Sequence, residues 1–281
     1  MKSIAKVAIV SSIVLVVGAL ICAGGIIIGG KDISNYSTAD YSTRTVDIDE
    51  DFNNIDIDVT SDDIYIYLSD NDSCTVELTE REGTSHEVGV EGDTLVITSD
   101  DGLENSINIG FNMQSPNIKI YLPASEYEKL NINITSGDIG ISDLTFDETS
   151  IATLSGDILI RSVAVNGTLE MTGGSSDIDL NDVTCENLVY DGTTGDVQLT
   201  DVIVAEDINI DVTTGDVTFD EIDALNIYVH TSTGDIEGSV LTDKTFDADV
   251  VTGDVSVPRS SEGGICELSA ITGDIDVYVV D

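Results

Sequence analysis

A column of aspartates is the feature of this 281-residue chain best suited to chemistry. One aspartate recurs every 19 or 20 residues, at Asp138, Asp157, Asp177, Asp196, Asp216, Asp235, Asp254 and Asp274. A ninth copy of the same motif is centred on Asp63. If the repeats stack in register, neighbouring carboxylates lie ~5 Å apart. Ca²⁺ bonds oxygens at ~2.3–2.6 Å, so one ion can bridge two of them. These eight aspartates are therefore the candidate metal ligands, with Ca²⁺ as the candidate ion.

A structural role in a turn is the competing interpretation of the same aspartates. Ser or Thr stands two residues before each one, and Ile or Val directly follows it. Gly directly precedes it in seven of the nine copies, and the exceptions are Asp62 and Ser176. Gly–Asp between two strand-like runs is a turn signal, and Asp can accept hydrogen bonds from nearby backbone amides. Carboxylates ~5 Å apart repel by about 1 kcal/mol in water, so hydrogen bonds, raised pKa values or cations must offset the repulsion.

Other residue types that could do chemistry have simpler interpretations. A second acidic line lies five residues after the first, at Asp143, Asp182, Asp201 and Glu221, and is typical of a solvated face. The Ser/Thr column is expected to bond to the backbone or to itself. The only histidines are His86 and His230, and neither has a His or Cys at ligand spacing. We predict no catalytic residue and no bound cofactor other than Ca²⁺.

The cysteines do not suggest a disulfide framework. Cys22 lies in an apolar run, and three cysteines remain outside it: Cys74, Cys185 and Cys266. Cys185 and Cys266 are about four repeats, ~19 Å, apart, beyond disulfide reach. Cys266 has the parity of a buried strand residue and is expected to be an apolar thiol.

The elements that carry the aspartates are predicted to be β-strands. Apolar residues alternate on both sides of each Gly–Asp turn, as in Ile208, Ile210 and Val212. Such alternation indicates strands with one buried face. A fixed period of this length is typical of stacked repeats. We therefore predict an all-β protein with a β-solenoid, a single-stranded β-helix of ~19–20 residues per coil. A β-sandwich with regular hairpins is the alternative.

The repeat also predicts the domain boundaries. Residues 130–281 are expected to form eight coils, and the less regular residues 46–129 a β cap, with a hairpin at Gly92–Asp93. The opposite end has no evident cap. The chain stops seven residues after Asp274, so Val277, Val279 and Val280 are expected near an open edge.

The N-terminus predicts a membrane anchor. Residues 7–30 contain no charge and are long enough to cross a bilayer as a helix. Lys2 and Lys6 precede them, so residues 1–6 are expected in the cytoplasm and everything after residue 31 outside. A cleaved signal peptide is the alternative, although the apolar run exceeds the usual length. Residues 31–45 are polar and aperiodic, and they predict a stalk.

Charge excludes two classes of partner. All 54 acidic residues lie after residue 31, where only seven Lys and Arg accompany them. Nothing there could neutralise the phosphates of a nucleic acid, and anionic lipids would be repelled. Cationic peptides or cationic protein surfaces are the partners that this charge favours.

Three features together resemble a known family. They are the opening Phe52-x-x-Ile55-x-Ile57, the Leu122-Pro123 pair, and the serial Ser/Thr-Gly-Asp-Ile/Val turns. The sequence is similar over residues 46–281 to the bacterial "putative adhesin" β-strand-repeat domain of unknown function. The resemblance implies an extracytoplasmic β-solenoid on a membrane-anchored envelope protein, with a link to envelope-stress regulation in some members. It transfers no catalytic residue.

Three functions follow from these observations. The first is a non-catalytic, membrane-anchored envelope protein that presents an acidic solenoid for binding or scaffolding. The second is a Ca²⁺-dependent surface adhesin. The third is a polysaccharide-active β-helix enzyme, which the uniform repetition of the carboxylates disfavours. Only Arg161, Lys244 and Arg259 are basic in the eight coils, and a catalytic centre is expected to interrupt the repeat.

Overall fold

The computed structural model describes residues 41–280 with gaps at residues 82, 102–114 and 261. The predicted cytoplasmic tail (residues 1–6), the membrane segment (7–30) and residues 31–40 of the stalk lie outside the described residues. The rest of the predicted stalk differs from expectation, because a strand begins at Tyr41. In the part of the chain that the structure describes, no helix has the length and hydropathy needed to cross a bilayer.

The described residues form strands and no helix. The strands are β1 (Tyr41–Ile48), β2 (Asn54–Ser61), β3 (Asp63–Leu68), β4 (Cys74–Arg81), β5 (Thr84–Glu91), β6 (Thr94–Asp101), β7 (Asn117–Leu122), β8 (Glu126–Ser136), β9 (Ile139–Ser142), β10 (Thr145–Ser155), β11 (Ile158–Ser175), β12 (Ile178–Thr194), β13 (Val197–Val204), β14 (Asp207–Thr214), β15 (Val217–Ile222), β16 (Asn226–Thr233), β17 (Ile236–Val240), β18 (Lys244–Thr252), β19 (Val255–Ser256), β20 (Gly264–Thr272) and β21 (Ile275–Val279).

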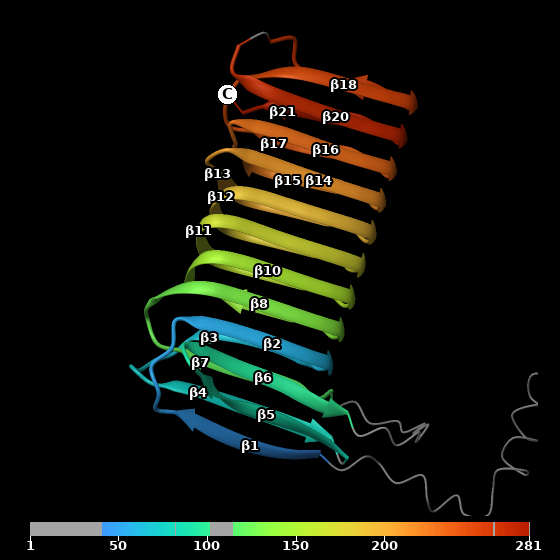
Figure 1. Cartoon of the computed structure of the whole chain (residues 1–281). Helices are drawn as coiled ribbons and strands as arrows, with labels where there is room; N and C mark the ends of the chain where they lie inside the picture. Colours follow the sequence, from blue (N-terminus) through green and yellow to red (C-terminus); the bar gives the residue numbers. More distant parts are fainter. Residues whose placement is uncertain (1–40, 82, 102–114, 261, 281) are drawn as a thin grey trace, which may run out of the picture. The chain divides into compact units, whose positions relative to one another are not determined.

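Successive repeats stack as coils of a β-solenoid (Figure 1). Strands that precede a Gly–Asp turn pair in parallel on one side, as β14 pairs with β16, and strands that follow it pair on the other, as β13 pairs with β15. The predicted all-β solenoid is therefore confirmed. The β-sandwich alternative is wrong, because equivalent strands of neighbouring repeats run parallel and in register, which hairpins cannot produce.

The core lies inside the coils, where every second residue of a strand points inward. Ile208, Ile210 and Val212 of β14 are buried, while the residues between them face outward. Large rings fill the interior, including Phe146 and Phe219. The three thiols in the described residues, Cys74, Cys185 and Cys266, are free and buried, and burial raises the pKa of each to about 12. They are apolar core groups, as predicted for Cys266.

The coils do not follow chain order at the C-terminal end. The last coil, β20–β21, lies between β16–β17 and β18–β19. The predicted open edge at the end of the chain is confirmed in part, because β19 covers only Ile275 and Asp276 of β21, whereas Val277 and Val279 pair with β17 alone among the described strands. The outermost strands are β18 and β19 (Figure 1). Burial of the inward residues is the physical reason. Cys266 and Leu268 of β20 and Ile275 of β21 are fully buried, whereas the inward residues Phe246 and Val250 of β18 are only half-buried.

The N-terminal end shows the same rearrangement. The coil β2–β3 lies between β6–β7 and β8–β9, although β6 and β7 come later in the chain. Antiparallel strands then close this end. On one side β5 pairs with β6, and on the other β4 pairs with β7 and β1 pairs with β4. The predicted hairpin at Gly92–Asp93 is confirmed, since Glu91 pairs with Thr94. The irregular region 46–129 thus contains two parallel coils and an antiparallel cover.

The glycine of each Gly–Asp turn is required by close stacking. Gly215 has a φ of 155°, and a Cβ atom there would lie 1.9 Å from the carbonyl oxygen of Gly195 in the coil below. A side chain at this position would meet both an unfavourable backbone conformation and a backbone atom that cannot move aside.

We expect Gly215→Ala to lower the free energy of unfolding by about 3 kcal/mol, because it combines a strained φ with a backbone clash. Thermal and urea unfolding of the purified chain measure the change. Gly89→Ala is the matched control, because a Cβ there has no atom within 4 Å. Equal stability of the two variants would contradict the close packing of the turns.

Candidate functional site

The recurring aspartates are joined into one hydrogen-bonded series, here called the aspartate ladder. Its nine members, in spatial order, are Asp63, Asp138, Asp157, Asp177, Asp196, Asp216, Asp235, Asp274 and Asp254. Each member after the first donates its backbone N–H to Oδ1 of the member before it, over 2.7–3.1 Å. The amide of Asp63 instead donates to the carbonyl oxygen of Pro116.

Backbone bonds on both sides hold the ladder in place. In the central coils, the Gly215 amide donates to the carbonyl oxygen of Thr233, and the Val217 amide donates to that of Asp235. The intervening Asp216 amide bonds to the side chain of Asp196. The carboxylate thus fills a gap in the backbone pairing at the turn. The hydrogen bond goes to the next coil rather than to the residue's own turn, because in-register stacking brings that amide within reach.

Every ladder member except the last, Asp254, accepts an amide on Oδ1 and keeps Oδ2 free of that bond, and most of these side chains are exposed. Among the described residues, no three or more His, Cys, Asp or Glu side chains are arranged to hold a metal ion. The Ca²⁺ prediction for the ladder stays a prediction. At the N-terminal member, burial raises the pKa of Asp63, and the charges of Asp138 and Asp62 raise it further, against the opposing effect of the Asp138 amide.

The second acidic line has a backbone role that the sequence did not suggest. The described residues other than glycine with positive φ are Asp143, Ser162, Asp182, Asp201 and Glu221, at 52–62°. They include all four acids of that line, and Ser162 takes the same place in its coil. These residues form a bend in the left-handed region, which short polar side chains tolerate better than most. Ser162 also donates its hydroxyl to Asp182, over 2.9 Å.

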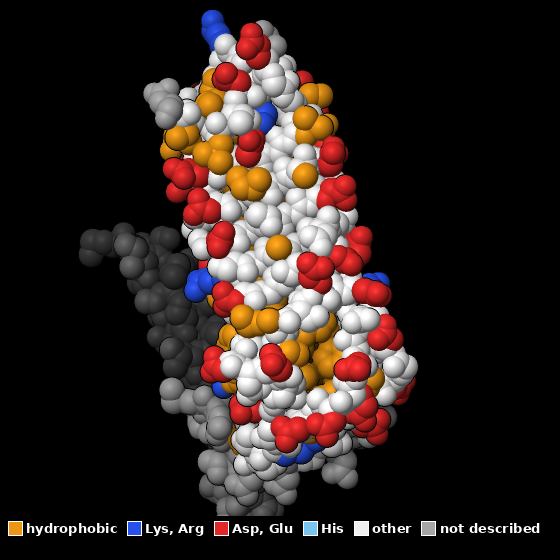
Figure 2. Space-filling model, turned by 90° about the vertical axis from the view of Figure 1, so that its left-hand side faces the viewer, with side chains coloured by type: hydrophobic (Ala, Val, Ile, Leu, Met, Phe, Trp, Pro, Cys, Tyr) orange, Lys and Arg blue, Asp and Glu red, His pale blue; other side chains and the backbone are white. Residues whose placement is uncertain are grey.

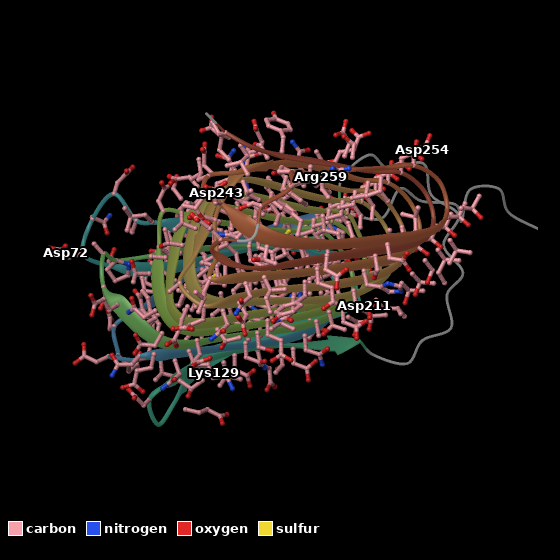
Figure 3. The ribbon with its side chains drawn as sticks, turned by 90° about the horizontal axis from the view of Figure 1, so that it is seen from above. Asp72, Lys129, Asp211, Asp243, Asp254 and Arg259 are labelled. Atoms are coloured by element: carbon pink, nitrogen blue, oxygen red, sulfur yellow. The ribbon has the colours of Figure 1, made fainter. Side chains whose placement is uncertain are left out.

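A further column, on the outer face of one side of the solenoid, contains two acidic side chains, a histidine and a serine. Asp191, Asp211, His230 and Ser269 lie opposite one another on β12, β14, β16 and β20. Figure 3 shows Asp211 projecting outward from the coil. These four residues, with Tyr228 and Glu267 among others, line a shallow groove of about 320 Å³. We call the residues Asp191, Asp211 and Glu267 the acidic groove carboxylates.

His230 and Ser269 of this groove are a base and a hydroxyl in contact. The Nδ1 atom of His230 lies 2.8 Å from Oγ of Ser269. A nucleophilic serine needs such a base, together with a group that orients the imidazole. In the described part of the chain, no carboxylate forms an ion pair with His230. The pair is therefore only part of a catalytic arrangement.

Sequence reasoning missed a buried network around His86. Nε2 of His86 lies 3.1 Å from Oδ2 of Asp62, and Nδ1 lies 3.2 Å from Oε1 of Glu80. Arg44 donates to both oxygens of Glu80, over 3.0 and 3.1 Å, and to the carbonyl oxygen of His86. The His86 side chain is fully buried. The available signal was Asp62 itself, an acid in place of the motif glycine.

Charge pairing controls the pKa values in this network. Burial favours the neutral imidazole, but the hydrogen bonds and charges of Asp62 and Glu80 outweigh it and raise the pKa of His86. Burial likewise opposes ionisation of Glu80, but hydrogen bonds from Arg44 and from the His86 amide outweigh it and lower its pKa. The two carboxylates therefore favour the protonated form of the imidazole at this end of the solenoid.

We expect Asp196→Ala to lower the free energy of unfolding by about 1–3 kcal/mol, because it leaves the Asp216 amide without its charged acceptor. Asp196→Asn keeps an acceptor oxygen and is expected to stay near the wild type. Asp211→Ala, which removes an exposed charge outside the ladder, is the control. Urea unfolding measures all three.

The same variants test Ca²⁺ in the ladder. A Ca²⁺-specific rise in melting temperature, absent with Mg²⁺ or matched ionic strength and lost in Asp196→Asn, would establish a metal site. A rise that monovalent salt reproduces would indicate screening of the repulsion between carboxylates.

We expect the stability of the protein to fall as pH rises above about 6.5, the unfolded pKa of histidine. The folded pKa of His86 is raised, so its contribution is complete below the unfolded value and is lost as pH rises through the folded value. Urea unfolding between pH 5.5 and 9 measures the effect, and this range lies above the titration of Glu80. The decline should vanish in His86→Gln and persist in His230→Gln. If His86→Gln loses stability with rising pH as the wild type does, another titrating group causes the loss.

Comparisons with known proteins agree with this fold. The family model described as Toastrack DUF4097 matches the chain twice, over residues 52–169 and 165–281. The structure of a "putative adhesin" from Bacteroides fragilis is similar, with a TM-score of 0.53 and 16% identity, covering 86% of this chain and 97% of its own. A "putative lipid binding protein" from Parabacteroides distasonis gives a TM-score of 0.54 and 22% identity with the same coverages. No curated protein matches the chain.

The two family matches together span most of the sequence, so the chain belongs to the Toastrack DUF4097 family, a domain of unknown function.

Proposed function

We propose that the chain is a non-catalytic, membrane-anchored protein of the cell envelope that binds cationic peptides or cationic protein surfaces. One observation carries the proposal: acidic side chains repeat in columns along the outside of the stack. Figure 2 shows acidic side chains spread along the length of one face. A rigid array with one charge per coil can meet a series of positive charges at a spacing of ~5 Å.

The acidic groove carboxylates are the part of the array best suited to a partner. Asp191 and Asp211 are register neighbours, and Glu267 lines the same groove. None of the three carboxylates donates to or accepts from another described side chain. By contrast, the ladder carboxylates already accept backbone amides. Groove carboxylates can therefore bond a lysine or arginine side chain without first giving up an internal hydrogen bond.

The few basic and nucleophilic groups support a non-catalytic role. His86 is buried and bonded to two carboxylates, and Lys244 is buried against Asp223 at 2.6 Å. His230 contacts Ser269, and among the described residues no carboxylate forms an ion pair with His230. A hydrolytic mechanism needs a nucleophile, a base and an orienting group that contact one another and are accessible to solvent.

The sequence supports attachment to a membrane. Residues 7–30 carry no charge, and Lys2 and Lys6 precede them. That pattern favours a single anchor with the N-terminus in the cytoplasm. The solenoid would then stand outside the cell, where cationic peptides and cationic surfaces are accessible to it.

We expect the full chain, held in zwitterionic nanodiscs, to bind decalysine with an affinity that falls at least about tenfold between 50 and 500 mM NaCl, because salt screens exposed charges. Surface plasmon resonance measures the dissociation constant. The double variant Asp191→Asn/Asp211→Asn should weaken binding at low salt. Asp70→Asn/Asp72→Asn, which removes the same charge from the exposed turn between β3 and β4, is the matched control.

Binding that persists unweakened in high salt would contradict the proposal. Equal effects of the two double variants would assign the binding to net charge and remove the acidic groove as its site. Loss confined to the groove variant would support both the function and its location.

A further inference from the structure

A trench on the outer face of the other side of the solenoid has a chemistry unlike the acidic columns. It follows β9, between β3 and β11, and has a volume of about 410 Å³. The three strands pair in register, so that Tyr65, Gly140 and Leu159 form one row and Tyr67, Ser142 and Arg161 form the next. We call this surface the tyrosine trench.

The trench exists because β9 carries the smallest outward side chains of the three strands. Ser142 forms the accessible part of its floor and Gly140 the part beneath the Tyr65 ring, while larger residues on β3 and β11 form its walls. Strands lie ~4.8 Å apart, so the walls are about 10 Å from each other. Gly140 is required here, because a Cβ atom would lie 2.9 Å from Cδ1 of Tyr65. The Tyr65 ring therefore lies over the glycine backbone and borders the trench on one side.

The tyrosines form an aromatic cluster at the edge of the trench. The Tyr65 and Tyr67 rings are nearly parallel, with 3° between their planes and 6.2 Å between centroids. Tyr121 of β7 extends this surface, 5.8 Å from Tyr67. All three side chains are half-buried, so they are packed in place and still have surface in contact with solvent. Figure 2 shows hydrophobic side chains gathered near the two ends of the face in view, with few between them.

Polar groups complete the trench on its other sides. Ser142 offers a hydroxyl on the floor, and Arg161 offers a guanidinium on the opposite wall. The ladder carboxylates of Asp138 and Asp157 lie at one end. Arg161 approaches Asp179 only to 3.6 Å, and both side chains are largely exposed, so its donors remain available. Donors and acceptors thus surround an apolar aromatic wall.

We propose that the tyrosine trench binds a neutral polysaccharide. A pyranose ring has an apolar C–H face that stacks on an aromatic ring, and a rim of hydroxyls that donate and accept hydrogen bonds. The trench offers both partners in one place. The net charge of −44 and the two ladder carboxylates repel sulfated or carboxylated sugars, so the polymer must be uncharged. The volume of about 410 Å³ suits a short segment of a sugar chain.

This site is independent of the proposed binding of cationic partners. It lies on β3, β9 and β11 and uses ring stacking, whereas the acidic groove lies on β12, β14, β16 and β20 and uses charge. Either function can fail in an experiment without affecting the other. Salt separates them, because stacking and neutral hydrogen bonds change little with ionic strength.

Affinity electrophoresis and a glycan array test the proposal on the full chain in detergent. The array carries neutral glucans, mannans and chitin oligosaccharides, with sulfated and sialylated glycans for comparison. We expect retention by at least one neutral class, in low and high salt alike, and none by the anionic classes. The chain has no Trp and nine Tyr, so a change in tyrosine fluorescence with the retained oligosaccharide is assigned to the trench where Tyr67→Ala reduces it and Tyr278→Ala does not.

Variants locate the binding. Tyr67→Ala is expected to weaken it about tenfold, the scale of one lost stacking contact. Tyr278→Ala removes an exposed tyrosine of β21 on the same side of the solenoid and should leave it unchanged. Ser142→Leu fills the floor without removing a core side chain, so it should abolish binding while the melting temperature stays near wild type.

Several results would overturn the proposal. They are retention of no neutral glycan, retention only of anionic glycans, or equal binding by Tyr67→Ala and the wild type. Competition by a proline-rich peptide but by no sugar would assign the trench to an extended peptide instead.

Discussion

In-register stacking through the aspartate ladder is the constraint on which the rest of the structure depends. At seven of the nine turns a glycine with positive φ packs against a neighbouring coil. After the first turn, the next amide donates to a carboxylate rather than to a backbone carbonyl, and this series of hydrogen bonds runs from Asp63 to Asp254 without a break. It keeps equivalent residues of neighbouring coils opposite each other. Outer side chains therefore form columns and rows, and both the acidic groove and the tyrosine trench result from that alignment.

The ladder also explains how so many carboxylates can lie close together. Each neighbouring pair repels, but each carboxylate gains a hydrogen bond from an amide that has no backbone acceptor at the turn. A hydrogen bond to a charged group contributes about 1.5–3 kcal/mol, which exceeds the repulsion of about 1 kcal/mol expected in water. Asparagine would keep the acceptor but give a weaker, uncharged bond. The acids on the outer strands receive no such compensation from the backbone, so their charge is available to solvent, ions and partners.

The coil could be predicted from the sequence because the Ser/Thr-Gly-Asp-Ile/Val motif marks each turn and the alternating apolar residues on both sides of it mark the strands. The sequence could not predict the coil order, since the coils centred on Asp254 and Asp274 share the motif and differ only in how completely their inward residues are buried. The His86 network brings together residues as far apart as Arg44 and His86, and only the substitution at Asp62 hinted at it. The trench was missed for a similar reason: Gly140 and Ser142 are unremarkable alone and become a floor only between the larger residues of β3 and β11.

The rearranged order at both ends protects the stack from fraying. A terminal coil held on one side only is the first part of a solenoid to open. Here the last coil of the chain is paired on both sides, and the outermost coil is connected to the stack at both of its ends, through β17 and through β20. Opening the outermost coil therefore frees a loop rather than a tail, which limits the conformational entropy gained. Asp247, Asp249 and Asp254 on that coil carry charge to an edge whose backbone groups could otherwise pair with another chain. At this end the described residues provide no covering strands. Two features protect the outermost coil there: the chain connects it to the stack at both of its ends, and its acidic side chains oppose pairing with another chain.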